Sequence, residues 1–425
     1  MRILLSLLLA AGLSLPAAAQ YRLLATDHEA YPLIQRLQRR GHLLSLHPTA
    51  LPYTEGELRQ ALAGIDTNQL SDLERAWAED LQVMMRPASR GLGAELEGNL
   101  VVSSTRRPDP FRPLPDSPTY VYPNGRGQLF FEAGSEDVGW AANAGVRHDT
   151  FYEYDPDGLD AARRAIMRNN HAYLGAGRLS GETRGFLYLG RLTSHWGASG
   201  QPALVLSDVP HAIDQLTLRI ETERGGIGEL ALRSVFGELD SSELDGTFNG
   251  RGGDRTSGED LTGDRFGSVR RYVAAHRLDW RPSPRFALTL TESVLFSSDN
   301  AGPSLKYLNP LTTATLAVDN APKNDENNGL IGGQLWWQTG RTTLHGELVL
   351  DDFDFVSGNE PPSIALTGSL WRSFDQFDAG VEATLVSARS YRTPQPEGTY
   401  VYLLRGLGTL FGDFVQLAGR ADWYV

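Results

Sequence analysis

Short stretches in which apolar and polar residues alternate fill the chain from about Leu92 to Val425. The clearest stretch, from Leu344 to Asp351, reads Leu-His-Gly-Glu-Leu-Val-Leu-Asp. Because successive side chains of a strand point to opposite faces, one face of this stretch is apolar and the other carries His, Glu and Asp. A closed sheet of such strands places lipid outside and water inside, which is the pattern of an outer-membrane β-barrel.

The alternation predicts fifteen strands, with approximate limits 92–104, 126–134, 137–149, 170–180, 183–193, 212–223, 227–238, 269–281, 285–297, 329–338, 341–353, 362–373, 376–388, 398–406 and 413–425. Short turns such as Thr339-Gly340 alternate with the long segments 105–125, 150–169, 194–211, 239–268 and 298–328. Bacterial barrels have short periplasmic turns and long external loops, whereas a soluble sandwich has no reason to keep this alternation. We therefore predict a mainly β, transmembrane outer-membrane barrel of about 16–18 strands.

The odd strand count needs an explanation, because a barrel with both ends in the periplasm has an even number of strands. The chain also ends Trp423-Tyr424-Val425, whereas such barrels usually end in an aromatic residue. Two alternatives stay open: a strand overlooked near 301–320, or a C-terminus truncated relative to that of related chains.

The N-terminal residues predict a secretory signal peptide over residues 1–19. Arg2 supplies the charged start, residues 3–15 are apolar, and Ala17-Ala18-Ala19 is a small-residue cleavage site before Gln20. The apolar run is too short to span a bilayer, so we expect it to be removed rather than kept as an anchor.

Residues 20–88 differ from the rest and predict a small helical module on the periplasmic side, followed by the barrel over 89–425. Three capping boxes mark helix starts: Thr26 with Glu29, Thr54 with Glu57, and Ser71 with Glu74. Leu73, Trp77, Leu81 and Met84 have helical spacing and are expected to form core.

Composition removes several classes of function. The 425 residues include no Cys, which excludes disulfides, thiol chemistry and Cys-ligated zinc. The net charge of −13 argues against nucleic acid as a partner. Mean hydropathy is −0.30, which fits a secreted β-protein as well as a barrel, and no later segment has eighteen consecutive apolar residues.

Several phrases together resemble the Wzi family of outer-membrane capsule-assembly proteins. They are His28-Glu29-Ala30-Tyr31, the run from Leu37 to Leu43, Leu51-Pro52-Tyr53, Gly190-Arg191 with His195-Trp196-Gly197, the run from Leu204 to Asp208, Tyr307-Leu308-Asn309-Pro310, and the run from Gly346 to Phe353. The resemblance implies an eighteen-stranded barrel, a periplasmic helical bundle and a lectin-like role in holding capsular polysaccharide. It departs after Gly412-Asp413, where relatives continue with further strands, and it carries no catalytic residues.

Sugar binding needs exposed aromatic faces beside polar side chains that bond to hydroxyls. The best such cluster is His195, Trp196, Asp208 and His211 in the long segment 194–211. The second is Lys306, Tyr307 and Asn309. The alternatives are that Trp196 packs a loop or belongs to an aromatic girdle, and that Asp208 caps a turn.

Other constellations predict no chemistry. Ser194 and His195 are adjacent and would point to opposite faces of a strand, so a hydrolase would need a distant base such as His276 or His345. The acidic, Gly-rich loop 239–268 does not have the spacing of an EF-hand, so we expect disorder rather than a calcium site. We predict no enzyme activity, no metal and no cofactor.

Charged residues at inward positions have two interpretations. Arginines could line an electropositive lumen, or they could form ion pairs with glutamates and brace the wall, which is the interpretation we favour. The residues concerned are Arg219, Arg233, Arg271, Arg277 and Arg420, with Glu95, Glu97, Glu221, Glu229 and Glu382.

The sequence therefore favours a non-enzymatic outer-membrane protein that binds capsular or surface polysaccharide. Its expected partners are that polysaccharide, outer-membrane lipid and the barrel-assembly machinery. The alternatives are a diffusion porin and, third, a barrel hydrolase.

Overall fold

The structure is a computed structural model, and thirteen stretches of the chain are described. They are residues 20–85, 91–102, 121–135, 137–150, 165–240, 242–243, 268–298, 305–310, 327–351, 363–393, 396–403, 405–410 and 412–424. The predicted signal peptide and most of the acidic loop 239–268 lie outside these residues.

One antiparallel sheet of sixteen strands dominates the described residues. Fourteen of them are neighbours in chain order: β1 (Leu92–Val102), β2 (Val121–Gly134), β3 (Val138–Thr150), β5 (Ala172–Arg178), β6 (Thr183–Leu192), β7 (Ile213–Arg224), β8 (Gly228–Glu238), β10 (Ser268–Ser283), β11 (Phe286–Ser298), β12 (Asn327–Thr339), β13 (Thr342–Asp351), β14 (Ser363–Ser373), β15 (Phe377–Val386) and β18 (Phe414–Trp423). The short strands β4 (Ala165–Asn169) and β9 (Ser242–Glu243) pair with β3 and β10.

Fourteen of the fifteen predicted strands are present in this wall, and the strand predicted over 398–406 is wrong. That segment instead contains the turn of 3₁₀ helix η3 (Pro396–Gly398) and a two-stranded hairpin, β16 (Val401–Tyr402) with β17 (Arg405–Gly406). Tyr400 and Tyr402 are buried in an apolar cluster, so their alternation reflects inward folding rather than a place in the wall. Without this segment the wall strands within the described residues number fourteen, which is even.

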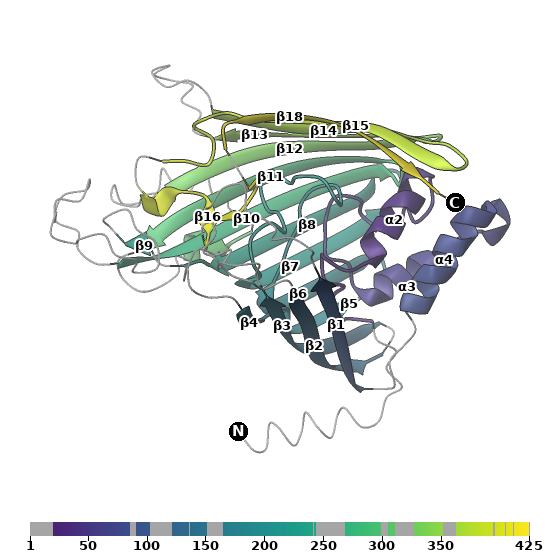
Figure 1. Cartoon of the computed structure of the whole chain (residues 1–425), viewed down its shortest axis with the longest axis horizontal. Coiled ribbons are helices and arrows are strands. Elements are labelled where there is room, and N and C mark those ends of the chain that lie inside the picture. Colours follow the sequence, from purple (N-terminus) through teal and green to yellow (C-terminus); the bar gives the residue numbers. More distant parts are fainter. Residues whose placement is uncertain are drawn as a thin grey trace.

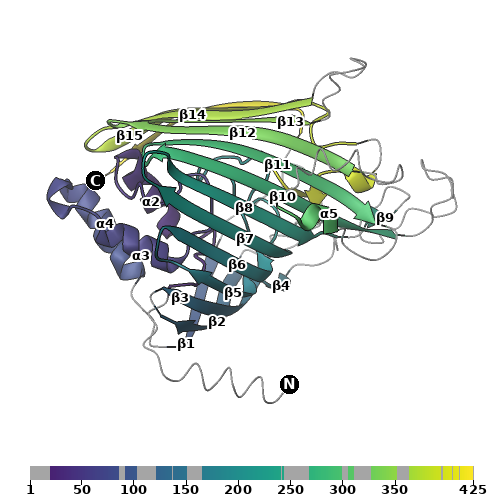
Figure 2. The ribbon, with the colours of Figure 1, turned by 180° about the vertical axis from the view of Figure 1, so that it is seen from behind.

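The sheet curls around the helices of the chain, as Figure 1 and the reverse view in Figure 2 show. Within the described residues β1 pairs only with β2 and β18 only with β15, so the first and last strands do not close the wall between them. Both edge strands carry exposed apolar side chains, such as Leu96 at 91% and Leu417 at 80% exposure.

The wall has the two faces that the alternation predicts. On β13 and β14 the buried positions are mostly polar, and the positions between them are apolar and exposed, such as Leu348, Leu366 and Leu370. The buried set is Thr343, His345, Glu347, Val349, Asp351, Ser363, Ala365, Thr367, Ser369, Trp371 and Ser373. An apolar outer face over a polar interior is the arrangement of an outer-membrane barrel.

Aromatic side chains mark both ends of the apolar outer face. At the end with the short turns 179–182, 225–227, 284–285, 340–341 and 374–376, here called the short-turn mouth, Trp280, Trp337 and Trp423 are exposed. At the opposite end, the long-loop mouth, helix α5 (Leu305–Leu308) lies over β10 and β11 (Figure 2), and its Tyr307 packs 4.3 Å from the ring of Phe296. Exposed tryptophans such as those at the short-turn mouth are typical of a membrane interface.

Three helices gather at the short-turn mouth (Figure 1): α2 (Ala30–Arg39), α3 (Glu55–Ala63) and α4 (Asp72–Met84), with a 3₁₀ turn η1 (Thr67–Gln69) before the last. Ile34, Leu37, Leu58, Trp77 and Leu81 form their shared core, which confirms the predicted stripe. Within the described part of the chain, no helix combines the length and the apolar character needed to cross a membrane.

Two of the three predicted capping boxes are formed. Thr54 with Glu57 and Ser71 with Glu74 cap α3 and α4 reciprocally. The box of Thr26 with Glu29 is wrong, because α2 begins at Ala30 and Glu29 makes no side-chain capping bond. The ring Nδ1 of His28 instead accepts from the Ala30 N–H at 3.1 Å.

Buried ion pairs join these helices to the wall. Arg40 Nη1 lies 2.7 Å from Asp378 Oδ1 of β15, and neither side chain is more than 1% exposed. Glu57 of α3 pairs with Arg219 of β7, and the guanidinium of Arg39 lies 3.4 Å from the ring centre of Trp371. These contacts hold the helices inside the mouth.

The predicted bracing by arginine–glutamate pairs is confirmed for Arg219 and Arg233, which both pair with Glu221. Arg277 and Arg271 also form ion pairs, but with the aspartates Asp279 and Asp240. Arg420 lies exposed on the edge strand β18. The interior is therefore a network of neutralised charges rather than an electropositive channel at these residues.

Because we assign the apolar outer face to lipid, a charge placed on this face should lower the free energy of unfolding more than a charge placed at a mouth of the barrel. Leu348→Arg places a cation on the apolar outer face and should lower the free energy of unfolding in lipid vesicles by about 2–4 kcal/mol. Gln376→Arg, in an exposed turn at the short-turn mouth, is the control and should cost about 0–1 kcal/mol. Equal urea midpoints for the two variants would contradict a lipid-facing Leu348.

Candidate functional site

The predicted sugar-binding loop folds into the barrel instead of projecting from it. Trp196 is 3% exposed and belongs to an apolar cluster with Leu204, Val205 and Leu206 of the same loop. Its backbone N–H donates to the Leu206 carbonyl at 2.7 Å. The expectation that Trp196 offers an exposed aromatic face is therefore wrong, and its ring packs the loop.

The cluster around Trp196 reaches across the lumen. It includes inward side chains from eight wall strands, and also Tyr391, Tyr400, Tyr402 and Leu407 from the segment between β15 and β18. The nine wall residues are Ile213, Val235, Val273, Ala275, Leu295, Leu330, Val349, Ala365 and Val386. Two folded segments thus fill the lumen at this level.

Hydrogen bonds fix the loop in place. The Leu204 N–H donates to Glu347 Oε1 at 3.0 Å, and Gln201 Nε2 donates to Ser369 Oγ at 2.8 Å. The Tyr391 hydroxyl donates to the Leu204 carbonyl at 2.8 Å. These bonds satisfy groups that would otherwise be buried without partners, which is costly inside a protein.

The loop also meets the helical module inside the barrel. Leu51 and His195 exchange two backbone hydrogen bonds, of 2.9 and 3.1 Å. The segment entering from the short-turn mouth and the loop entering from the long-loop mouth therefore form one continuous body.

His195 makes two polar side-chain contacts within the loop. Its Nδ1 lies 3.0 Å from Asp208 Oδ1, and its Nε2 lies 3.2 Å from the Ala198 carbonyl oxygen. Because both ring nitrogens face acceptors, the protonated ring satisfies both contacts. Burial alone would lower the pKa of His195, but the hydrogen bond and charge of Asp208 outweigh it and raise that pKa; the pKa of Asp208 is lowered in turn.

The remaining predicted residues are spread over several surfaces. Asp208 is exposed and His211 half-buried at the long-loop mouth. Tyr307 is 1% exposed because it packs on the outer face of β10 and β11, whereas Asn309 is exposed. Lys306 lies in α5 with Tyr307. The structure does not bring the two predicted clusters into one site.

The residues weighed for hydrolysis have other partners. The Ser194 hydroxyl accepts from Gln215 Nε2 at 3.3 Å, while His345 Nδ1 lies 3.0 Å from Gln201 Oε1. His276 pairs with Glu292 through contacts between β10 and β11. Within the described stretches, no three His, Asp or Glu side chains are grouped so as to hold a metal ion.

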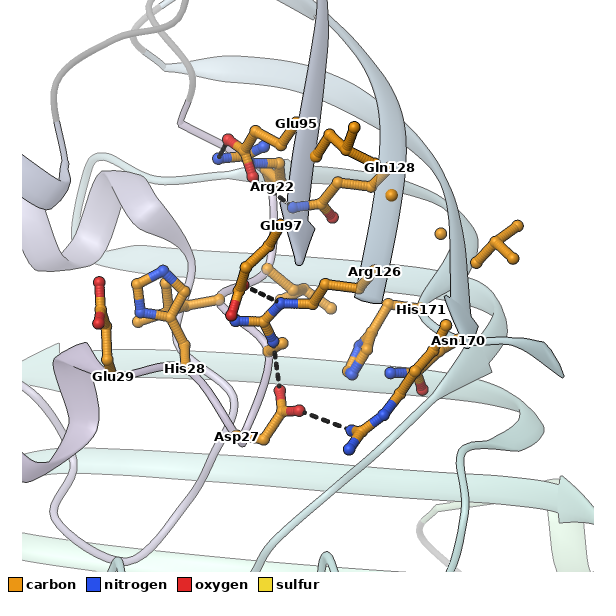
Figure 3. A pocket seen from close by; sticks show the side chains of 18 of the residues that line it. Arg22, Asp27, His28, Glu29, Glu95, Glu97, Arg126, Gln128, Asn170 and His171 are labelled. Carbon is orange, nitrogen blue, oxygen red and sulfur yellow. Dashed lines mark hydrogen bonds and ion pairs between the residues drawn. The ribbon is translucent and has the colours of Figure 1, made fainter. Parts of the chain in front are cut away.

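A polar pocket lies where the N-terminal segment 22–29 faces the inner wall of β1, β2 and β3 (Figure 3). Its volume is about 410 Å³. The charged and polar residues that line it are Arg22, Asp27, His28, Glu29, Glu55, Glu95, Glu97, Arg126, Gln128, Arg147, Asn170 and His171.

Asp27 is the centre of the polar network in this pocket. Its Oδ1 lies 3.3 Å from Arg126 Nη1 and its Oδ2 lies 3.0 Å from Arg147 Nη1, as the dashed lines in Figure 3 mark. Arg126 Nε also donates to Glu97 at 2.5 Å, and Arg22 Nη2 donates to Glu95 at 2.8 Å. Burial and the charge of Arg126 lower the pKa of His28, which favours the neutral imidazole.

Sequence reasoning missed this pocket, although it named Glu95 and Glu97 as inward wall residues. The strand register places Glu95 opposite Gln128 and Glu97 opposite Arg126. Glu95 and Glu97 are two residues apart in their strand, as are Arg126 and Gln128 in theirs, so each pair points to one face of the sheet. That spacing was a signal in the sequence. The contribution of Asp27, from a segment about a hundred residues away, had no local signal.

Comparison with known proteins shows the fold. No protein-family model and no curated protein matches the chain. Among solved structures, the chain is similar to Wzi of Escherichia coli, described as an outer-membrane protein involved in group 1 capsule assembly and as a carbohydrate-binding β-barrel. That match has 13% identity and a TM-score of 0.62, over 94% of this chain and 81% of Wzi.

A second match is the outer-membrane channel DcaP of Acinetobacter baumannii, with 13% identity over 70% of this chain and 91% of DcaP. Its TM-score of 0.28 is too low to support an argument. The Wzi likeness and the two-faced sheet together establish the fold of an outer-membrane β-barrel.

The His195–Asp208 pair predicts a pH response of the lumenal loop. A raised pKa means that the contribution of the pair to stability is fully present below the usual His value of 6.5 and is lost as pH rises through the raised pKa. Asp208→Asn removes the charge but keeps the burial, so the pKa of His195 should fall below 6.5. NMR titration of the His195 imidazole in detergent micelles measures its pKa in the wild-type protein and in Asp208→Asn. An unchanged pKa in Asp208→Asn would refute the pairing of His195 with Asp208.

Proposed function

We propose that this chain is a non-enzymatic outer-membrane protein that binds capsular or surface polysaccharide and helps to hold it at the cell surface. The observation that carries the proposal is the lumen filled by folded chain in a wall of outer-membrane type. The fold likeness to Wzi, a carbohydrate-binding barrel, supports the same class of ligand.

The filled lumen argues against the diffusion porin. A solute would have to displace the cluster around Trp196, the backbone pair of Leu51 with His195, and the ion pair of Arg40 with Asp378. Removing one partner of a buried ion pair typically costs about 3–5 kcal/mol, so an open path is not a small rearrangement.

The polysaccharide would contact the long-loop mouth, which faces outward when the short turns face the periplasm. The proposed contacts there are the exposed Asp208 and Asn309, the half-buried His211, and Lys306. Trp196 and Tyr307 are buried and would support these residues by packing, not by stacking on sugar rings.

The remaining parts of the proposal follow from the wall. Lipid would contact the apolar outer face between the two mouths. The signal peptide 1–19 would direct export, and the barrel-assembly machinery would insert the sheet.

Polysaccharide retention tests the proposed function. A deletion strain should release its capsular or surface polysaccharide into the medium, and the wild-type gene should restore cell-bound polysaccharide. The double variant Asp208→Ala/Asn309→Ala should restore less than Glu79→Ala/Asp80→Ala, a control on the exposed face of α4. A deletion strain that keeps its polysaccharide cell-bound would refute the role.

Conductance separates the proposal from the porin. Purified protein in planar lipid bilayers should show no steady open channel, because the lumen holds two folded segments and the helical module. A constant open conductance in the wild-type protein would favour the porin instead.

A further inference from the structure

We infer that the pocket between segment 22–29 and the inner wall of β1–β3 is a second carbohydrate site, suited to neutral, hydroxyl-rich sugar rings rather than to uronates. The inference rests on the proposed polysaccharide-binding function, but it assigns a different surface and a narrower ligand class. This pocket is separate from the loop residues at the long-loop mouth.

The size and the position of the pocket suit a short sugar segment. Small-ligand sites have volumes of about 300–1,000 Å³, and this pocket has about 410 Å³. It lies on the polar, inner side of the wall, and its two sides come from the helical module and from the sheet (Figure 3). A ligand there would contact both.

The charge balance determines which sugars fit. The pocket lining has three arginines, Arg22, Arg126 and Arg147, against five carboxylates. Arg59, beside the pocket, pairs with one of these carboxylates, that of Glu55, so one negative charge is in excess when both histidines are neutral. The carboxylates are Asp27, Glu29, Glu55, Glu95 and Glu97. A uronate would add a like charge beside them, and like charges in close contact are disfavoured. A neutral sugar has no such cost.

The polar groups are held in place before any ligand binds. Asp27 fixes two guanidinium groups, and Glu97 fixes one of them from the other side. These side chains remain about a third to a half exposed, with Asp27 and Arg147 at 41%, Glu97 at 56% and Arg126 at 34%. Preorganised groups with free surface bind at a smaller entropic cost.

Sugar hydroxyls match this mixture of groups. Carboxylates only accept and guanidinium groups only donate, whereas a hydroxyl does both and can bridge the two. Hydrogen bonds to charged groups are also stronger than neutral ones.

A metal ion fits the pocket less well. Both oxygens of Asp27 face arginines, and Glu95 and Glu97 each face an arginine as well. A metal ion that bound these carboxylates would displace the arginines and leave the guanidinium groups without ion-pair partners.

The test compares the binding of neutral sugars with that of a negatively charged sugar. Full-length protein in micelles is titrated with glucose, galactose and mannose trisaccharides, and with trigalacturonate as the charged counterpart of galactotriose. At least one neutral trisaccharide should bind, and trigalacturonate should bind at least about tenfold more weakly than that sugar. Calorimetry measures the affinity. NMR spectra of isotope-labelled protein, followed at the residues beside Asp27 and Arg147, locate the binding site.

Charge variants test whether the carboxylates of the pocket cause the preference for neutral sugars. Glu29→Gln/Glu97→Gln removes two carboxylate charges from the pocket lining and should narrow the difference in affinity between neutral and uronate sugars at least threefold. Glu79→Gln/Asp80→Asn removes the same charge from the exposed face of α4, away from the pocket, and should leave that difference unchanged. Elution volume and melting temperature show whether each variant is folded.

Three results would overturn the inference: no neutral trisaccharide binds, trigalacturonate binds as well as the neutral sugars, or the α4 control narrows the difference in affinity equally. None of these would affect the proposed function, which is tested by the deletion strain. A strain that loses its polysaccharide while the pocket binds nothing would leave the function standing and reject this site.

Discussion

A wall with an apolar outer face must satisfy its backbone N–H and C=O groups within the sheet, because lipid supplies no hydrogen-bond partner. The fourteen wall strands meet this constraint by continuous antiparallel pairing from β1 to β18. The strand form of the wall, and the alternation of side chains that comes with it, follow from this constraint. At the outer edges of β1 and β18 no pairing partner is present within the described residues, and Leu96 and Leu417 are exposed there.

The inner face raises a second problem, because its polar side chains are buried by folded chain and need polar partners there. Ion pairs solve it in two ways. Wall residues pair with one another, as Arg233 does with Glu221, and wall residues pair with the helical module, as Asp378 does with Arg40. Such pairs cost desolvation free energy and add little net stability, but breaking one leaves a buried charge. The ion pairs therefore determine the position of the helical module more than they add to the stability of the protein.

The same filling of the lumen links the two proposed surfaces. The loop around Trp196 and the module meet at Leu51 and His195, so the long-loop mouth and the short-turn mouth are mechanically joined. The polar pocket lies beside the module, where segment 22–29 leaves space against β1 and β2. One rigid interior can thus present polar groups toward the outside and toward the lumen.

The sequence by itself determined the elements whose pattern is local. Period-two alternation located fourteen wall strands, and the capping residues located α3 and α4, because each signal involves residues within a few positions of one another. It failed at 398–406, where alternating tyrosines face a core cluster instead of a wall. It also failed for the exposure of Trp196, which is buried in a cluster that gathers side chains from eight wall strands. Only the tertiary structure placed Asp27 between Arg126 and Arg147, since such contacts depend on how the module enters the barrel and not on neighbouring residues.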